Sequence, residues 1–446
     1  MFCAIDFGTS NSAIAIPEPG RKTGTGTDRD RDRDRDATMQ LVELEAGHVT
    51  MPTAVFYFAP TSGAAEPAGP PRAFGRAAVA AYVDGLDGRL MRSMKSILGS
   101  SLIDQTTDAG GGRGVKYLDI VAGYLKHLKT RAEAQAGAPI HRAVIGRPVF
   151  FVDDDPLRDA QAQAALETAA RQIGFDDIHF QYEPIAAAFA YERSVRTEQI
   201  VLVADIGGGT SDFSVVRVGP LRAARIDRKA DILANHGVHV AGTDFDRRVE
   251  LAAILPAYGY GGFGPSVAGA PPREVPSGVY FDLATWHLIN TVYNPMRVTE
   301  LRGMRGFYAD PVHHERLMTV LQERLGHELA ARAEQAKIDV AEGGATRIDL
   351  SHTERHLSAA LTEHEAAQAI EADVLRIVAA ARHAATQAGL ASTQIDALYF
   401  TGGSTGLRLL AGRIAAAFPT ARAVHGDRFA SVATGLGLHA QRWFGR

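Results

Sequence analysis

Two glycine-rich turns contain the residues of this sequence best suited to chemistry. Asp6 ends an apolar strand and is followed by Phe-Gly-Thr-Ser-Asn up to Ser12, and Asp205 ends a longer apolar strand and is followed by Ile-Gly-Gly-Gly-Thr-Ser up to Asp212. Glycine lets the backbone turn sharply and approach a ligand closely, and successive N–H groups in such turns bind anions. Mg²⁺ gives up its water reluctantly, so an aspartate at each turn can hold the ion through that water. The two matched turns predict a phosphate site with Mg²⁺ held by Asp6 and Asp205.

Three further features could serve this site. Lysine is scarce, with seven in the chain against forty arginines, and the Lys95 ammonium suits a γ-phosphate or an attacking water, although a surface position on a helix is the alternative. Glu183, at a strand–helix junction before a proline, could orient water or act only as a helix N-terminal acid. The turn 401–406 has small residues that could accept a base or ribose, or could simply connect a strand to a helix.

Other patterns exclude several classes of protein. There is no Gly-x4-Gly-Lys-[Ser/Thr] loop and no Rossmann glycine spacing after the first strand. No histidine pair has a zinc-ligand frame. The net charge of −4 does not indicate a nucleic-acid partner. The single cysteine, Cys3, fits a reducing cytoplasm, and neither a signal peptide nor a run of 18 apolar residues is found, so we expect a cytoplasmic protein without a membrane span.

Apolar strands that alternate with helical patterns predict an α/β protein with two similar halves. The expected strands include 142–145, 175–181, 199–205 and 397–400. The expected helices include 156–173, 184–193, 317–342, 363–390 and a last one from about residue 431. The expected loops are 20–38, with its run of alternating Asp and Arg, then 60–72, 110–114 and 256–278, the last inside an inserted subdomain at 225–345.

Together the motifs resemble the ATPase domain of DnaK-type 70 kDa heat-shock chaperones, in the actin, sugar-kinase and heat-shock superfamily. The family motifs Asp-Leu-Gly-Thr-Thr-Asn-Ser and Asp-Leu-Gly-Gly-Gly-Thr-Phe-Asp are similar to residues 6–12 and 205–212. Glu-Pro-Thr-Ala-Ala-Ala, Lys-Arg-Leu-Ile-Gly and Gly-Gly-Ser-Thr-Arg are similar to residues 183–188, 95–99 and 402–406. The resemblance runs from residue 2 to about residue 440, interrupted by the Asp-Arg loop and by 256–312.

The resemblance implies a role for each matching residue. Those implied to line the β- and γ-phosphates are Gly8, Thr9, Ser10, Asn11, Gly207, Gly208, Gly209 and Thr210. Those implied in catalysis are Asp6, Lys95, Glu183, Asp205 and Thr210, with Asp6 and Asp205 holding Mg²⁺ through water. Those implied to contact the adenosine are Glu334, Lys337, Gly402, Gly403, Ser404 and Asp427. Ile338 and Ala341 stand where the family usually has arginine and serine, so adenine would be held differently.

The resemblance also implies a two-lobed actin-like ATPase fold. Two duplicated ribonuclease-H-like subdomains would carry smaller inserted subdomains and hold the nucleotide in the central cleft. Lobe I would comprise residues 1–195 with 46–116 as its insertion, and lobe II residues 196–424 with 229–344 as its insertion. Residues 425–446 would form a helix that returns to lobe I. The peptide-binding domain of the family has no counterpart in the sequence, so peptide clamping is not expected.

The implied function is a slow, Mg²⁺-dependent ATPase that converts ATP and water to ADP and phosphate. It would act as a nucleotide-driven switch in protein folding or quality control, with client proteins or co-chaperones as partners. Three alternatives remain open. One is a nucleotide sensor or adaptor that does not hydrolyse ATP, and another is a small-molecule kinase of the same superfamily, which would need an acidic base beyond the two metal aspartates. The third is a filament-forming, actin-like protein, against which the 256–278 stretch and the charged loop argue.

Overall fold

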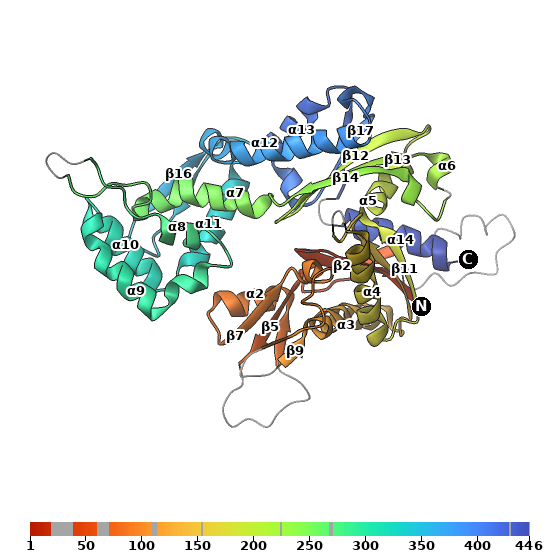
Figure 1. Ribbon diagram of the computed structural model, residues 1–446, viewed down its shortest axis with the longest axis horizontal. Helices are drawn as coiled ribbons and strands as arrows, with labels where there is room; N and C mark the ends of the chain where they lie inside the picture. The colour runs from red at the N-terminus through yellow and green to blue at the C-terminus, as the bar shows by residue number, and fades with distance from the viewer. Residues whose placement is uncertain are drawn as a thin grey trace.

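The structure is a computed structural model that describes residues 1–18, 39–59, 71–108, 114–152, 155–223, 225–266, 271–427 and 430–445. The predicted loop 20–38, with its Asp-Arg run, lies outside the described residues, as do most of the predicted loops 60–72 and 110–114. Two large β-sheets form the body of the molecule, with helices between them and on their outer faces (Figure 1).

The first sheet has six strands in the order β11-β10-β1-β2-β3, with β4 beside β2. They are β1 (Phe2–Phe7), β2 (Asn11–Pro17), β3 (Met39–Leu41), β4 (Thr50–Pro52), β10 (Arg142–Arg147) and β11 (Asp177–Tyr182). Successive side chains of a strand point to opposite faces. Cys3, Ile5 and Phe7 therefore pack in one core with α3 (Tyr117–Ala136) and α4 (Pro156–Gln172). Ala4 faces the other core, with α5 (Glu183–Glu192) and α14 (Ser431–Phe444).

The second sheet has the order β14-β13-β12-β17-β18. Its strands are β12 (Gln199–Ile206), β13 (Ser211–Val218), β14 (Ile232–Val238), β17 (Ala397–Thr401) and β18 (Arg422–His425). Val201 and Val203 of β12 share the core of α5 and α14, so these two helices lie between the sheets. Leu202 and Ala204 pack on the opposite face against α12 (Glu363–Gln387) and α13 (Arg408–Ala417). Both sheets thus begin with a β-hairpin whose first strand runs through the centre of the fold.

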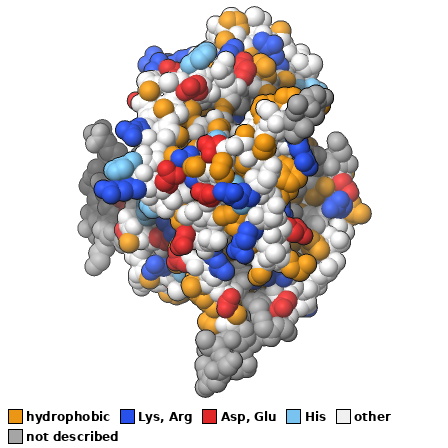
Figure 2. Space-filling view, turned by 90° about the vertical axis from the view of Figure 1, so that its left-hand side faces the viewer, with side chains coloured by type: hydrophobic (Ala, Val, Ile, Leu, Met, Phe, Trp, Pro, Cys, Tyr) orange, Lys and Arg blue, Asp and Glu red, His pale blue; other side chains and the backbone are white. Residues whose placement is uncertain are grey.

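Two smaller units extend from this body toward each other (Figure 1). One consists of β5 (Ala54–Phe58), β6 (Arg72–Phe74), α2 (Gly75–Val83) and β7 (Gly88–Arg92), followed by the hairpin β8 (Thr106–Asp108) and β9 (Gly114–Lys116). The other consists of α7 (Gly242–Val249), α8 (Gly278–Leu283), α9 (Pro295–Arg302), α10 (Pro311–Gln322), α11 (Gly326–Asp339) and the hairpin β15 (Ala345–Asp349) and β16 (Ser358–Thr362). A short helix, α6 (Pro220–Ala223), follows β13. The helical unit is at the left of Figure 1, and Figure 2 shows basic and acidic side chains interspersed over that end of the molecule.

Local signals place several helix ends correctly. Asp155 caps α4, where its side chain accepts a hydrogen bond of 3.0 Å from the Arg158 backbone N–H, and Pro156 occupies the first turn. Gly174 follows the helix in the left-handed region, with φ at 87°. The predicted helix from about residue 431 is α14.

The single helix predicted over 317–342 is wrong, because the structure divides it into α10 and α11. Arg324 between them adopts a left-handed conformation with φ at 54°. The break lets Gly326 start α11 against the turn Ile289–Tyr293, where a Cβ would lie 2.6 Å from Ile289 Cγ2. Helical periodicity continues across the break, so it could not reveal this contact between distant segments.

We propose that the two lobes divide near residue 195, as the sequence predicts. Helix α5 ends at Glu192 and β12 starts the second sheet at Gln199, so only a short connection joins the halves at this point. Helix α14 packs against β1, β2 and β10 of the first sheet as well as α5, which supports its assignment to lobe I.

Candidate functional site

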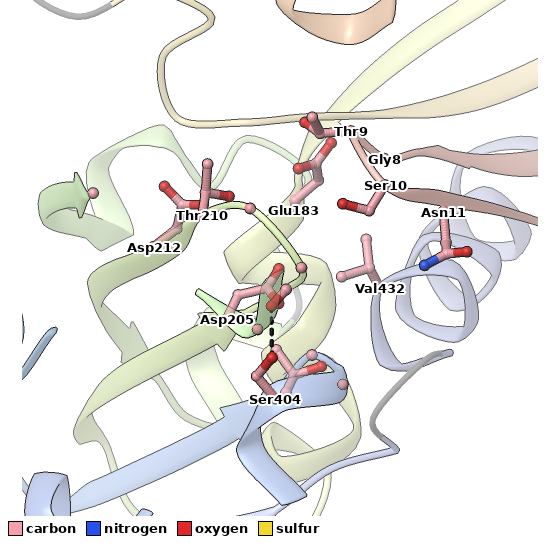
Figure 3. Close-up of a pocket in the computed structure, with 18 of the residues that line it drawn as sticks. Gly8, Thr9, Ser10, Asn11, Glu183, Asp205, Thr210, Asp212, Ser404 and Val432 are labelled. Carbon is pink, nitrogen blue, oxygen red and sulfur yellow. Dashed lines mark hydrogen bonds between the residues drawn. The ribbon is translucent and has the colours of Figure 1, made fainter. Parts of the chain in front are cut away.

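A cleft of about 830 Å³ lies where the two hairpins meet. Its volume is within the range of small-molecule sites in proteins. The cleft brings together 17 of the residues singled out above, which are Asp6, Gly8, Thr9, Ser10, Asn11, Lys95, Glu183, Asp205, Gly207, Gly208, Gly209, Thr210, Glu334, Lys337, Gly402, Gly403 and Ser404. They come from segments spread across almost 400 positions of the chain, and Figure 3 shows several of them around a common space.

The two hairpins have the same construction. Asp6 is paired with Ala13, and Asp205 with Asp212, and each aspartate stands one residue before the end of its strand. In the first turn, a Cβ on Gly8 would lie 2.1 Å from the Asn11 carbonyl oxygen, so a larger residue would open the turn.

The turns also face each other across the cleft. A Cβ on Gly208 would lie 3.4 Å from Ser10 Oγ, which shows how closely the second turn approaches the first. Thr53 holds the first turn, because its hydroxyl donates to the Gly8 carbonyl at 2.8 Å. Thr243 holds the second, because its hydroxyl donates to the Gly208 carbonyl at 2.8 Å.

The third turn, Gly402–Gly406, is attached directly to the second hairpin. Ser404 Oγ donates a hydrogen bond of 2.7 Å to the Gly207 carbonyl oxygen (Figure 3). Gly402 has φ at 86°, and a Cβ there would lie 2.4 Å from the Ile206 carbonyl oxygen. Only glycine fits both the conformation and the space, and the turn is therefore fixed against β12.

Lys95 and Glu183 form an ion pair at the edge of the cleft. Lys95 lies in a 3₁₀ turn, Met94–Ile97, and the preceding Ser93 has φ at 53°. Its Nζ is 2.5 Å from Glu183 Oε1, and the Lys and Glu side chains are 9% and 16% exposed. A positive charge is thereby held next to the aspartates of the two hairpins.

The carboxyl groups of the cleft are crowded and poorly hydrated. Desolvation by the cleft walls, together with the charges of Asp212 and Glu183, raises the pKa of Asp205 to about 7, although Lys95 opposes the shift. Desolvation and the Glu183 charge also raise the pKa of Asp6. A cluster whose members discourage each other's ionisation suits a divalent cation. No group of three or more His, Cys, Asp or Glu in the described part of the chain is placed to bind a metal directly.

Helix α11 supplies another wall of the cleft. Glu334, Lys337 and Ile338 recur at helical spacing and line it, and Ala341, in the turn after the helix, lines it as well. The Lys337 ammonium lies 2.6 Å from Asp246 Oδ1. Along this wall the charged residues Glu334 and Lys337 come first, and the apolar residues Ile338 and Ala341 follow. Desolvation raises the pKa of Asp246 to about 6, although Lys337 opposes the shift.

Asp427, which the resemblance implies to contact adenosine, is not among the residues that line the cleft. Its Oδ1 accepts a hydrogen bond of 2.8 Å from the Ala430 backbone N–H, and its carbonyl oxygen accepts one from Ser431. These bonds stabilise the chain leading into α14, and contact of Asp427 with adenosine stays a prediction.

The sequence predicted no role for several polar residues that line the cleft, among them Asp212, Ser214, Asn235 and His239. Desolvation raises the pKa of Asp212, while a hydrogen bond from Thr210 opposes the rise. Its position directly opposite Asp205 in the hairpin was a usable signal, because directly paired residues share a face. Asn235 had no comparable signal, since only pairing of β14 with β13 brings it to Ser214, at a hydrogen-bond distance of 2.7 Å.

Parts of this chain are similar in sequence to known proteins. Residues 104–253 match the family described as Hsp70 protein. A chaperone protein HscA homolog of Aromatoleum aromaticum is 32% identical over 274 residues, which cover 56% of this chain and 38% of that protein. A chaperone protein DnaK of Thermosipho melanesiensis is 41% identical over 134 residues, covering 29% of this chain and 20% of that protein. The DnaK of Thermotoga neapolitana is 40% identical over 133 residues, with the same coverage. The matches thus span about a fifth to two fifths of the length of these relatives.

These matches support membership of the chain in the Hsp70 family. Its fold is accordingly the actin-like ATPase fold, which confirms the fold class predicted from the sequence. In the cleft between the sheets, Glu183 and the Asp205 turn, which lie within the matched residues 104–253, meet the first hairpin and the third turn. Within the described residues, no helix combines the length and apolar character needed to cross a membrane.

Proposed function

We propose that this chain binds ATP with Mg²⁺ in the cleft and hydrolyses it slowly, as a chaperone-type ATPase. The observation that carries the proposal is the convergence of two acid-glycine-hydroxyl hairpins and the Lys95–Glu183 pair on one cleft. Backbone N–H groups of the two facing turns are suited to phosphate oxygens. The relatives described as chaperone proteins support the chaperone assignment.

Each polar group of the cleft has a place in this proposal. The Lys95 ammonium would stabilise negative charge on the γ-phosphate, and Glu183 would hold that ammonium and orient the attacking water. Asp6 and Asp205 would hold Mg²⁺ through its water shell. When bound, the ion would neutralise charge on the phosphate oxygens. Hydrolysis would then depend on positioning and electrostatics rather than on a covalent intermediate.

Release of inorganic phosphate by the purified protein tests this proposal. We expect Mg²⁺-dependent release that falls strongly in a Lys95→Ala variant. The proposal is rejected if release does not depend on Mg²⁺ and the variant equals the wild type. Tight ATP binding without phosphate release would instead indicate a nucleotide sensor. Release that requires an added sugar would indicate a small-molecule kinase.

The cellular role is proposed from the same cycle. ATP binding in a cleft between two sheets can change the relative orientation of the two lobes. This change would control the binding of client proteins or co-chaperones in the cytoplasm. Nucleotide-dependent co-purification with wild type and Asp205→Asn tests this step. Partners that bind both proteins equally, with and without ATP, would contradict it.

A further inference from the structure

The third turn spans the distance between the phosphate turns and the far wall of the cleft. At one end, Ser404 donates to the Gly207 carbonyl of the second hairpin. Just beyond the other end, the Arg408 guanidinium donates a hydrogen bond of 3.2 Å to the Glu342 carbonyl oxygen, directly after the last turn of α11. A nucleotide whose phosphates lie at Gly207 would therefore extend along this turn toward the end of α11.

The walls change from polar to apolar in the same direction. On α11, Glu334 and Lys337 come first, and Ile338 follows four residues after Glu334 on the same face, while Ala341 lies in the turn just after the helix. The carboxylate and ammonium suit the hydroxyl groups of a ribose. The remaining space is a slot between the apolar side chains of Ile338 and Ala341 and the third turn.

The slot has few side-chain groups that could form hydrogen bonds with the edge of a base. Its four lining residues nearest the Arg408–Glu342 link are Ile338, Ala341, Gly406 and Leu407, and none of them has a polar side-chain atom. Ile338 is 53% exposed, so its surface is free to cover a flat ring. A site that binds a base edge with hydrogen bonds can discriminate by ~10⁴-fold or more, whereas apolar contact discriminates weakly.

We propose that this slot holds the purine ring by apolar contact alone, so that the cleft accepts guanine nucleotides as well as adenine nucleotides. The inference rests on the proposed nucleotide site and adds a specificity to it. Ile338 is the residue assigned to cover the ring of either purine. Because the same methyl and methylene groups contact both rings, its removal should weaken both nucleotides alike.

Isothermal titration with Mg·ADP and Mg·GDP tests this, since neither is hydrolysed during the measurement. We expect dissociation constants within about tenfold of each other. We expect Ile338→Ala to weaken both by a similar factor, roughly three- to tenfold, leaving their ratio unchanged. Leu375→Ala is the matched control, because Leu375 is 55% exposed on α12 and does not line the cleft. It should change neither constant.

Each other outcome has a distinct meaning. Binding of Mg·GDP more than about 100-fold weaker than Mg·ADP would overturn the inference while leaving the proposed ATPase intact. The inference would also be overturned if Ile338→Ala weakened the binding of only one of the two nucleotides, because Ile338 would then contact a group that only one of the bases has. Binding of neither nucleotide would overturn the proposed function together with the inference.

Discussion

Lys95 Nζ lies 2.5 Å from Glu183 Oε1, although 88 residues separate the two in the chain. Lys95 follows β7 of the small three-stranded unit, and Glu183 is the first residue of α5, between the two large sheets. The pair therefore links an inserted unit to the centre of the molecule. It also places the Lys95 ammonium beside Asp6 and Asp205, where this cation lowers their pKa values while Glu183 and burial raise them.

The first prediction is that Lys95 and Glu183 act as one unit in hydrolysis. Lys95→Met and Glu183→Gln should each lower the single-turnover rate by roughly 10²-fold, because each removes the partner that positions the other. The double variant should lose little more than the worse single variant. Lys126→Met, an exposed position on α3, is the control and should retain the wild-type rate. Losses that multiply in the double variant would show that the two residues act independently.

The sequence predicted those parts of the site whose signals are local. The acid-glycine-hydroxyl pattern that begins at Asp6 and at Asp205 spans no more than eight consecutive residues, and both turns line the cleft. The scarcity of lysine and a strand–helix junction singled out Lys95 and Glu183 one by one, and family motifs gave them roles, but nothing in their neighbourhood reveals that the two side chains meet. The roles given to these residues stay predictions, since geometry alone places them together.

Other features depend on contacts that no local pattern encodes. The break before Gly326 results from the close approach of a distant turn, and the orientation of Asp427 results from its hydrogen bond to the Ala430 backbone. The fold class was nevertheless predictable, because the alternating apolar strands and helices repeat in both halves. The contact between the two extended units, described next, joins residues about 200 positions apart and had no signal in the sequence.

Arg92 and Trp286 meet across the cleft. The Arg92 guanidinium lies 4.2 Å from the centre of the Trp286 ring, and the Tyr82 ring packs against the same ring in a tilted arrangement, with 5.0 Å between the ring centres. Arg92 directly precedes the segment that places Ser93 and Lys95 in the cleft, and Trp286 also contacts His327 at the start of α11. This contact joins the two units that line the cleft from opposite sides.

The second prediction is that Trp286→Ala speeds nucleotide release by about tenfold. Cation–π and aromatic contacts of this kind each contribute about 0.5–1.5 kcal/mol, and about 1.4 kcal/mol corresponds to a tenfold rate change. Stopped-flow displacement of a fluorescent ADP analogue measures the rate. Phe263→Ala is the control, because Phe263 is 51% exposed and does not line the cleft. An unchanged release rate in Trp286→Ala would show that the contact does not restrain the cleft.

The third prediction concerns stability in acid. His439 is 2% exposed on α14 between His179 and Phe189, and Gln181 Nε2 lies 3.0 Å from its Nδ1. Desolvation, with nearby positive charges, lowers the pKa of His439 to about 3. The unfolded chain, with a histidine pKa near ~6.5, then binds more protons than the folded one, so stability falls as the pH drops below that value.

Between pH 7 and pH 5, His439 should account for a loss of about 2 kcal/mol in the free energy of unfolding. Denaturant titrations of His439→Gln at the two pH values should show a correspondingly smaller loss than wild type. His364→Gln, on the exposed first turn of α12, should retain the wild-type loss. Equal acid sensitivity in His439→Gln and wild type would contradict the assignment.

The fourth prediction concerns a buried charge network beside α5. The fully buried Arg228 guanidinium makes two hydrogen bonds of 2.9 Å to Glu192 and a third to Asp231, and both acids are almost completely buried. Arg228→Met would leave the buried Glu192 carboxylate without its cation and Asp231 with Arg222 alone, at a cost of about 3–5 kcal/mol in the free energy of unfolding.

A matched exposed pair separates the effect of burial from that of the charge alone. Arg305 and Glu315 lie 3.2 Å apart with both side chains 61% exposed, so Arg305→Met should cost only about 0–1 kcal/mol. Replacing Glu192 by Gln and Asp231 by Asn in the Arg228→Met background should recover much of the loss, because neutral amides are easier to bury than unpaired carboxylates. Denaturant unfolding of all the variants measures this order. If Arg228→Met lowered the free energy of unfolding no more than Arg305→Met does, the prediction would be wrong. Water would then have to reach the Arg228 network, and burial would not explain the need for the arginine.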